Sequence, residues 1–343
     1  MLVMGIESSC DETAISVLRN GKEVLSSNVY SQIETHKVFG GVVPEVAARE
    51  HLKIIHKLAL TTLEDAKVTI EDIDAIAVTR GPGLVGALLV GISYAKGLAM
   101  ATKKPLIPVN HVHAHVHGAL LGVDASNDEI FPCLALVISG GHSNIYFMES
   151  PTEYELMAYT IDDACGESFD KVAKLFDLGY PGGPRIEKLA QQGDENAFKM
   201  PRMVEQKSKL YFSYSGLKTF MVNLKKKHNS ELNEDMIADM CASFQKEALG
   251  QLVRKTKSCL THKKVKSILV AGGVAANKKF KEYVSKDIPV PCYFPNLAYC
   301  SDNAAMIAGL GYYIALEKGL DHKDFYNYGW DAFSRYDLSS SKR

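Results

Sequence analysis

Four histidines, His111, His113, His115 and His117, occur within seven residues of the chain. In an extended strand all four would share one face, whereas in a helix capped by Asn110 the pair His111 and His115 would lie one turn apart. The apolar residues that follow favour the helix. Because this spacing suits two imidazole ligands, we predict a metal site at His111 and His115 rather than a purely structural pair. His113 and His117 are given no role.

A second group of polar side chains is acidic. The segment Glu7-Ser8-Ser9-Cys10-Asp11-Glu12-Thr13 places three carboxylates between two expected strands. Asp302 stands at the start of the last expected helix and is a candidate third metal ligand, although its spacing alone does not bring it to His111. Helix capping and solvation explain such acids as well as function does.

Two glycine-rich loops follow expected strands, Ser139-Gly140-Gly141-His142-Ser143 and Gly272-Gly273-Val274-Ala275-Ala276-Asn277. Glycine allows close approach of the backbone to a ligand, and exposed N–H groups in such turns bind anions. Neither loop has the GxxxxGK[ST] pattern of a P-loop, which excludes ordinary Walker-type ATP hydrolysis. Together the loops predict a nucleotide in a cleft between two lobes.

The elements that must position these residues alternate between strands and helices, which predicts an α/β fold. We expect strands at 2–6, 14–18, 23–26, 73–79, 106–109, 134–139, 144–148 and 267–271. We expect helices from Pro44, from Leu84, and at 164–177, 184–192, 235–260 and 303–317. Asn20-Gly21 predicts a two-residue hairpin turn. Strand–turn–strand openings near both 2 and 134 predict two related lobes, 1–132 and 133–320, with a tail at 321–343; exchange of the last helix between the lobes is left open.

Bulk properties narrow the classes of function. The 343 residues are 46% hydrophobic and 23% charged, with a net charge of -1, so no global basic field indicates nucleic acid. Three lysine clusters, at 225–227, 263–266 and 278–281, are either RNA contacts or solvated faces. Seven scattered cysteines without a CxxC pair and the lack of a leader predict a cytoplasmic enzyme. The apolar stretch 84–100, with small residues and Lys96, predicts a close-packed helix rather than a membrane span.

Many motifs agree with one known family in the same order along the chain. They are 5–13 with its Ser-Cys-Asp-Glu-Thr, 40–45, 81–83, Asn110-His111 with His115, 139–142, 162–171, 180–184, 272–277 and Asp302-Asn303. Over residues 3–317 the chain resembles the universal tRNA adenosine threonylcarbamoyltransferase family, formerly called O-sialoglycoprotein endopeptidase. The Ser-Cys-Asp-Glu-Thr form resembles its bacterial and organellar branch, the TsaD type.

The resemblance implies a two-lobed actin/sugar-kinase/Hsp70-like (ASKHA) fold with the active site in the interlobe cleft. It implies one divalent metal ion per subunit, iron or zinc, held by His111, His115 and Asp302. It implies that threonylcarbamoyl-adenylate contacts residues of the second lobe: Ile138, Ser139, Gly140, Gly141, His142, Asp170, Gly183, Glu187 and Asn277. Where this chain has Glu187 the family often carries Asp, and a ribose contact is implied for this longer side chain.

The implied reaction is acyl transfer to the exocyclic amine of the adenosine 3′ of the anticodon, in tRNAs reading ANN codons, with release of AMP. Asp11 or Glu12 is our candidate to accept the amine's proton. The implied partners are tRNA, a silent paralogue (TsaB type), a small P-loop ATPase (TsaE type) and a separate enzyme (TsaC type) that makes the adenylate. The helices from Pro44 and Leu84 are either the paralogue interface or part of the lobe's own core.

Three other functions are considered. A metalloprotease of the HExxH class lacks its general base here, because no Glu lies between the two histidines. A small-molecule kinase of the same fold would need an acceptor pocket and magnesium. A non-catalytic scaffold that binds nucleotide and RNA would not need the full set of metal ligands.

Overall fold

The computed structural model describes residues 1–39, 41–123, 126–203 and 210–335. It divides into two compact units, each considered by itself. Unit 1 comprises Met1–Ser126, Ser150–Tyr154 and Pro295–Arg343, and unit 2 comprises Asn127–Glu149 and Glu155–Phe294. The last helix therefore lies in unit 1 with the N-terminal residues. The low-complexity tail at 339–342 lies outside the described residues.

Unit 1 is built on a five-stranded sheet in the order β3-β2-β1-β4-β5. The strands are β1 (Leu2–Glu7), β2 (Glu12–Arg19), β3 (Glu23–Ser31), β4 (Ala75–Gly81) and β5 (Leu106–Asn110). The first three pair antiparallel, whereas β1, β4 and β5 run parallel. Asn20 and Gly21 both have positive φ, 51° and 70°, which confirms the predicted hairpin turn.

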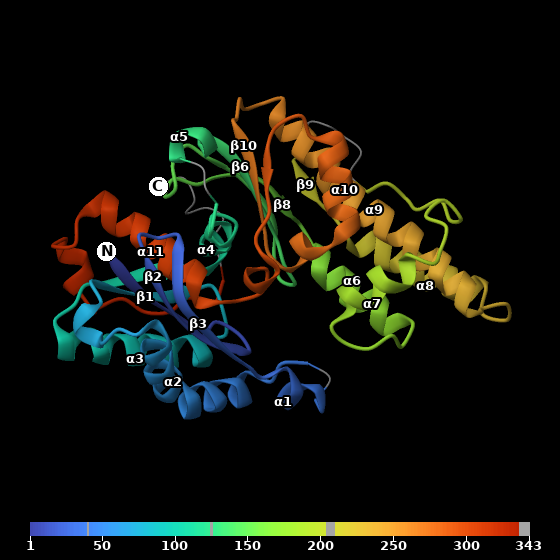
Figure 1. Ribbon diagram of the computed structural model, residues 1–343. Coiled ribbons are helices and arrows are strands. Elements are labelled where there is room, and N and C mark those ends of the chain that lie inside the picture. The colour runs from blue at the N-terminus through green and yellow to red at the C-terminus, as the bar shows by residue number, and fades with distance from the viewer. Residues whose placement is uncertain (40, 124–125, 204–209, 336–343) are drawn as a thin grey trace. The chain divides into compact units, whose positions relative to one another are not determined.

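Helices cover both faces of this sheet, because successive strand residues point to opposite sides. Met4 and Ile6 pack toward α2 (Pro44–Ala66) and α3 (Val85–Thr102), while Val3 packs toward α11 (Ala304–Lys318). Figure 1 shows α2 and α3 side by side beneath the strands of unit 1. The short helices are α1 (Ile33–Lys37) and α4 (His111–Gly118), with 3₁₀ turns at Ile70–Asp72, Leu297–Tyr299 and Lys323–Tyr326.

Among the described residues, α3 is the one helix long and apolar enough to cross a membrane, judged by length and composition. Its inner side, including Leu88 and Ile92, is buried in the core of unit 1. Its outer side leaves Val85, Leu89 and Met100 exposed. The inner packing is that of a helix in a globular domain.

Unit 2 repeats the same plan in its sheet, whose order is β11-β10-β6-β7-β8-β9. Strands β6 (Cys133–Ile138), β7 (Ser143–Met148) and β8 (Glu155–Thr160) pair antiparallel, as β1, β2 and β3 do. Strands β10 (Ser267–Ala271) and β11 (Cys292–Tyr293) run parallel to β6, as β4 and β5 do to β1. The predicted relation between two lobes is therefore confirmed, with β9 (Tyr211–Phe212) as an added strand.

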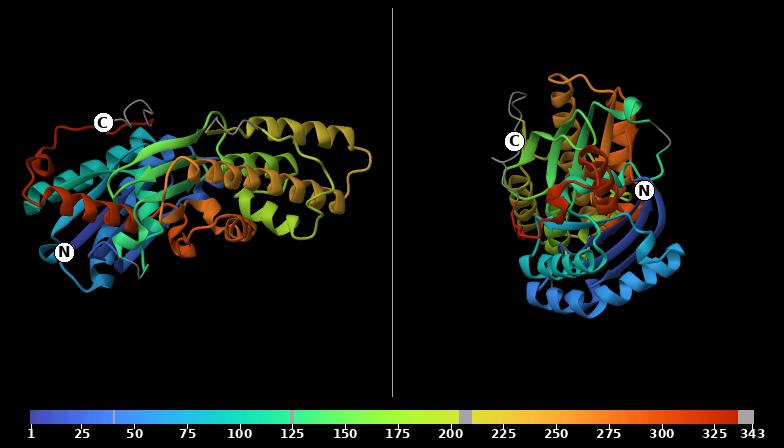
Figure 2. Two further views of the ribbon diagram at one scale, coloured as in Figure 1. Left: turned by 90° about the horizontal axis from the view of Figure 1, so that it is seen from above. Right: turned by 90° about the vertical axis from the view of Figure 1, so that its left-hand side faces the viewer.

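The helices of unit 2 are α5 (Asn127–Ile130), α6 (Cys165–Leu175), α7 (Gly182–Ala190), α8 (Ser215–Lys227), α9 (Glu234–Leu260) and α10 (Lys278–Asp287), with a 3₁₀ turn at Gly273–Ala276. Three of them, α6, α7 and α9, are those expected, with shifts of a few residues at their ends. The sequence did not predict α5, α8 and α10; the lysine clusters within α8 and α10 were considered only as RNA contacts or solvated faces. Figure 2 shows α9 as a long helix beside α8.

Candidate functional site

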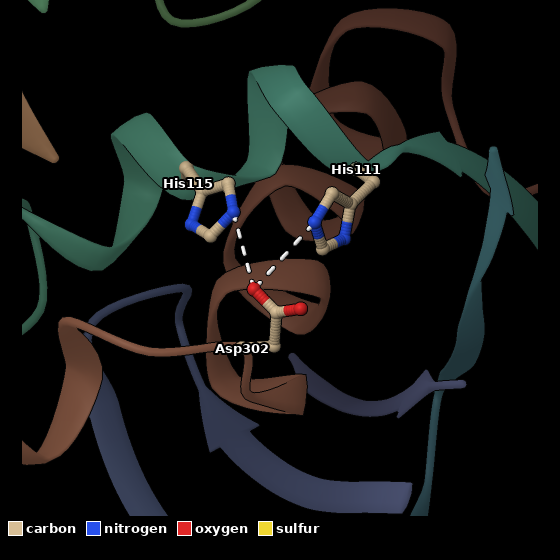
Figure 3. Close-up of side chains that lie close together, drawn as sticks. All are labelled: His111, His115 and Asp302. Atoms are coloured by element: carbon tan, nitrogen blue, oxygen red, sulfur yellow. Dashed lines mark ion pairs between the residues drawn. The ribbon is translucent and has the colours of Figure 1, made fainter. Parts of the chain in front are cut away.

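The predicted helix around the histidines is α4, which begins after β5. Asn110 is its N-cap and accepts hydrogen bonds from the backbone N–H groups of Val112 and His113, at 2.9 and 3.2 Å. His111 and His115 lie on one face of this helix and are 5% and 2% exposed. Figure 3 shows both imidazoles directed at one carboxylate oxygen of Asp302.

The three side chains have the geometry of a metal site. Asp302 Oδ1 lies 3.6 Å from Nε2 of His111 and 3.3 Å from Nε2 of His115, and the three ligand atoms lie within 4.8 Å of one another. Tetrahedral zinc with bonds of about 2.1 Å separates its ligand atoms by roughly 3.4 Å. Neither ring nitrogen of His115 has a hydrogen-bond partner among the described residues. A buried imidazole without such a partner is suited to bind a metal ion through one of its ring nitrogens.

Glu7 supports this triad from the end of β1. Its Oε2 lies 2.9 Å from Nδ1 of His111 and accepts a hydrogen bond from Thr79 Oγ1 at 2.6 Å. A carboxylate beside Nδ1 keeps the proton on that nitrogen and leaves Nε2 free for a metal. The sequence analysis missed this role. A signal was available, since β1 and β5 are parallel neighbours of β4 and end at the same edge of the sheet.

The carboxylates of Glu7 and Asp302 stabilise positive charge at the triad. Burial lowers the pKa of His111, but the carboxylates of Glu7 and Asp302 outweigh it and raise the pKa to about 9. Burial would raise the pKa of Glu7, yet His111 lowers it overall. In the metal-free protein at pH 7, His111 is therefore a charged imidazolium with a proton on each ring nitrogen. A metal ion must displace the proton on Nε2 to bind there.

The acidic turn between β1 and β2 carries the two candidate proton acceptors. Asp11 is 9% exposed. Burial, with the charges of Asp302 and Asp11, raises the pKa of Glu12 to about 9. Without a metal Glu12 is therefore a neutral acid at pH 7, and a cation held by Asp302 would favour its ionised form.

His113 and His117 have a structural task that the sequence did not reveal. His117 Nε2 lies 3.0 Å from both the Pro151 carbonyl oxygen and the Tyr154 hydroxyl. His113 stacks on the Tyr154 ring, with ring centroids 3.9 Å apart. Burial lowers the pKa of His113 to about 3 and that of His117 to about 4. These neutral rings attach the segment Ser150–Tyr154 to α4 on the side away from the metal ligands.

In unit 2 the predicted loops lie at the ends of β6 and β10. The Ser139 hydroxyl accepts a hydrogen bond from the His142 backbone N–H at 3.2 Å, which closes the turn after β6. A Cβ added at Gly272, where φ is +90°, would lie 2.4 Å from the Ile138 carbonyl oxygen. The two strand ends therefore pack backbone to backbone, and this needs glycine. A Cβ at Gly140, Gly141, Gly183 or Gly273 would meet open space. These glycines line an open rim, which suits close approach of a ligand.

Three side chains that are predicted to contact the adenylate also make hydrogen bonds inside unit 2. Asp170 Oδ1 accepts a hydrogen bond from the Gly182 backbone N–H at 2.7 Å, at the start of α7. Glu187 Oε1 accepts one from the Lys278 N–H at 2.7 Å. Asn277 caps α10 by accepting from the Phe280 N–H and donates to Gln245 Oε1, both at 2.9 Å. All three side chains therefore hold helix N-termini at this edge of unit 2.

Asp162 accepts hydrogen bonds at the N-terminus of a helix. Its carboxylate accepts hydrogen bonds from Ser213 Oγ and the Tyr214 N–H at 2.6 and 2.7 Å, and from the Ser215 hydroxyl at 2.8 Å. These donors begin α8. Asp162 is thus a structural residue in this chain.

Several lysines of the three clusters make hydrogen bonds or ion pairs within the protein. Lys225 donates to the Leu175 carbonyl oxygen at 2.6 Å, and Lys263 pairs with Glu155 at 2.6 Å. Lys266 donates to the Asp128 carbonyl oxygen at 2.6 Å, and Lys279 pairs with Glu195 at 3.3 Å. At least one member of each cluster is therefore bound within the protein, and RNA contact by the others stays a prediction.

The sequence is similar to that of known proteins over nearly its whole length. The model of the family described as TsaD, tRNA N6-adenosine threonylcarbamoyltransferase, matches residues 23–309. A protein of that name from Clostridium botulinum is 48% identical over 315 residues, with 91% of this chain and 92% of the relative covered. One from Bacillus subtilis is 46% identical over 326 residues and covers 93% and 92%. These relatives span nearly all of this chain.

Solved structures share its fold at low sequence identity. HypF from T. kodakarensis is 15% identical with a TM-score of 0.61, covering 94% of this chain and 49% of that one. ROK hexokinase from Thermus thermophilus is 14% identical with a TM-score of 0.51, covering 92% and 100%. The sugar kinase and the duplicated sheet plan confirm the two-lobed α/β fold of the ASKHA type.

Proposed function

Because this chain belongs to the tRNA N6-adenosine threonylcarbamoyltransferase family, we propose that it transfers a threonylcarbamoyl group from threonylcarbamoyl-adenylate to tRNA. The acceptor is the exocyclic amine of the adenosine 3′ of the anticodon in tRNAs reading ANN codons. The amine nitrogen forms a bond to the carbamoyl carbon, the bond from that carbon to the phosphate oxygen breaks, and AMP leaves with the electron pair. The amine gives up one proton to a base.

The observation that carries this proposal is the triad of His111, His115 and Asp302, with Nδ1 of His111 held by Glu7. The three ligands suit iron or zinc, one ion per subunit. When bound, the metal supplies Lewis-acid polarisation of a substrate carbonyl oxygen. The chain's part is to direct Nε2 of both buried imidazoles toward the Asp302 carboxylate.

An aromatic amine such as that of adenosine is a weak nucleophile, so positioning of the amine and removal of its proton must both contribute to the rate. Asp11 is our first candidate for the base. Glu12 serves only when ionised, because its pKa of about 9 keeps it protonated in the metal-free protein. Asp11→Asn with full turnover on preformed adenylate would remove Asp11 from the mechanism.

The adenylate is proposed to bind at the loops of unit 2. The open rim at Gly140, Gly141 and Gly183 offers backbone N–H groups to carbonyl and phosphate oxygens. Ile138, Ser139 and His142 would line the acyl side. Asp170, Glu187 and Asn277 would face the adenosine, and each has hydrogen-bonding capacity beyond its helix contact.

The proposed partners follow from the family: tRNA, a silent paralogue of the TsaB type, a small ATPase of the TsaE type and a separate TsaC-type enzyme that makes the adenylate. The exposed apolar sides of α2 and α3, with Leu52 71% and Leu89 43% exposed, support a paralogue interface there. A cytoplasmic location goes with this set of partners.

One assay tests the function directly. Purified protein receives synthetic threonylcarbamoyl-adenylate and tRNA, with and without the candidate partners, and modified nucleoside is measured by mass spectrometry. We expect product with the wild type and none with His111→Ala. His113→Gln, on the other face of α4, is the matched control and should retain product. Glycoprotein cleavage would instead favour a protease, and phosphate transfer from labelled ATP a kinase.

A further inference from the structure

The turn between β1 and β2 is held at three consecutive carbonyl groups by three different parts of unit 1. The Ser9 carbonyl oxygen accepts from the Leu84 backbone N–H at 2.8 Å, and that of Asp11 accepts from the Gln32 backbone N–H at 2.9 Å. Between them, the Cys10 carbonyl oxygen lies 3.0 Å from Nε2 of His51. Of these three contacts, only the one from His51 comes from a side chain.

His51 reaches the turn from α2 and has a second contact there. Its Nδ1 lies 2.7 Å from the Thr13 hydroxyl oxygen. A carbonyl oxygen only accepts hydrogen bonds, so Nε2 carries the proton and Nδ1 accepts from Thr13. One neutral imidazole thus bridges both ends of the segment Cys10–Thr13, which contains Asp11 and Glu12.

Burial of the polar His51 side chain carries a free-energy cost that an apolar side chain at this position would not have. The side chain is 0% exposed and shares the inner face of α2 with Ile55, which is 3% exposed in an apolar core. A buried imidazole must have its hydrogen bonds satisfied, whereas a leucine would pack there without that requirement. Both of its hydrogen bonds go to the acidic turn, and none goes to another part of the core.

We propose that His51 is a positioning residue for the transfer reaction: it fixes the Cys10–Thr13 turn and so sets the direction of the Asp11 and Glu12 carboxylates. This inference rests on the proposed function, in which one of these carboxylates takes the proton from the amine. A carboxylate displaced by a fraction of an ångström still allows substrate to bind, so the effect belongs in kcat rather than in KM.

Two pairs of variants test the contact from both sides. Thr13→Val removes the hydroxyl while keeping the side-chain shape, and Thr13→Ser restores a hydroxyl. His51→Leu removes both hydrogen bonds, whereas His51→Gln keeps an N–H donor for the Cys10 carbonyl and an oxygen acceptor for the Thr13 hydroxyl. Because His51→Leu risks misfolding, Thr13→Val is the decisive variant. His262→Gln, an exposed histidine of unit 2, is the matched control.

We expect Thr13→Val and His51→Leu to lower kcat by about 10- to 100-fold, with KM for adenylate and tRNA within about twofold of wild type. Thr13→Ser, His51→Gln and His262→Gln should stay near wild type, and metal content should be unchanged in all five. In hydrogen-exchange mass spectrometry, the peptide containing Ser8–Thr13 should exchange faster in the first two variants only.

A folded Thr13→Val protein with wild-type kcat and wild-type exchange would overturn the inference, as would a loss of activity that only follows the unfolded fraction. The exchange measurement needs no turnover. A wild-type protein that forms no modified nucleoside therefore removes the proposed function, whereas unchanged exchange in Thr13→Val and His51→Leu removes this inference.

Discussion

Oε2 of Glu7 lies 2.9 Å from Nδ1 of His111, and this contact decides which nitrogen of the imidazole faces Asp302. Glu7 is fully buried, and its other oxygen, Oε1, accepts a hydrogen bond from the Ser9 backbone N–H at 2.5 Å. The carboxylate is therefore held on both sides and cannot rotate away without leaving buried donors unpaired. Glu7 makes His111 a ligand of defined tautomer.

Replacing Glu7 with Gln should weaken metal binding. The amide keeps the size of the side chain, but its N–H₂ can donate to Nδ1 and move the imidazole proton to Nε2, where it blocks the ligand position. We expect a loss of about 10- to 100-fold in affinity for zinc, measured by competition with a chelator of known affinity. Glu45→Gln is the control, since Glu45 is exposed and pairs with Arg49 on the same helix. Equal affinity in both variants would show that Glu7 does not orient His111.

Asp162 should give the protein a measurable stability at neutral pH that disappears in acid. Burial raises the pKa of Asp162, but the hydrogen bonds from Ser213, Tyr214 and Ser215 outweigh it and hold the pKa below its usual value. A lowered pKa in the folded state stabilises the protein above the unfolded pKa of about 4, and this contribution is lost as pH falls through the folded value.

Asp162→Asn should therefore lower the free energy of unfolding by roughly 1 kcal/mol at pH 7, because an uncharged amide group replaces the carboxylate that accepts from the Ser213 and Ser215 hydroxyls, and hydrogen bonds to a charged group are the stronger ones. The difference from wild type should shrink as the pH is lowered below about 4. Urea unfolding at several pH values measures it. Asp321→Asn, at an exposed position, should show no such difference at any pH. If the difference in free energy of unfolding between wild type and Asp162→Asn instead grew as the pH fell, the assigned capping role would be contradicted.

Much of the fold follows from local pattern, because hairpin turns, caps and apolar periodicity are short-range properties. Asn110 could be recognised as a cap, and with it the common face of His111 and His115. Asp302 could not be placed in the same way, since it reaches the triad only after the chain returns from unit 2 to begin α11. His51 was hidden for a related reason. Its partners Cys10 and Thr13 lie on another element, and only the packing of α2 on the sheet brings them together.

Asn277 should show two separable effects. Its Oδ1 caps α10 and its Nδ2 donates to Gln245, so Asn277→Ala should cost about 1–2 kcal/mol of stability before any substrate is considered. Asn277→Asp keeps the capping oxygen and should recover most of that loss in thermal unfolding. If Asn277 also contacts the adenylate through its N–H₂ group, Asn277→Asp should still raise KM for the adenylate. Recovery of both stability and KM would leave Asn277 with the cap alone.

Substitutions on the two faces of α2 distinguish the two roles considered for this helix, which are the interface with the paralogue and the core of the lobe. Leu52 is 71% exposed, whereas Ile55, three residues later, is 3% exposed. A charge at Leu52 meets water, so Leu52→Glu should change the free energy of unfolding by no more than about 0.5 kcal/mol. The same charge at Ile55 would be buried among apolar side chains, and Ile55→Glu should yield unfolded or insoluble protein. If the paralogue binds here, Leu52→Glu should be folded by circular dichroism yet fail to associate with it in sedimentation velocity, while Asp321→Asn still associates. A folded Leu52→Glu protein that binds the paralogue as tightly as wild type would place the interface elsewhere and leave the exposed leucine without a partner role.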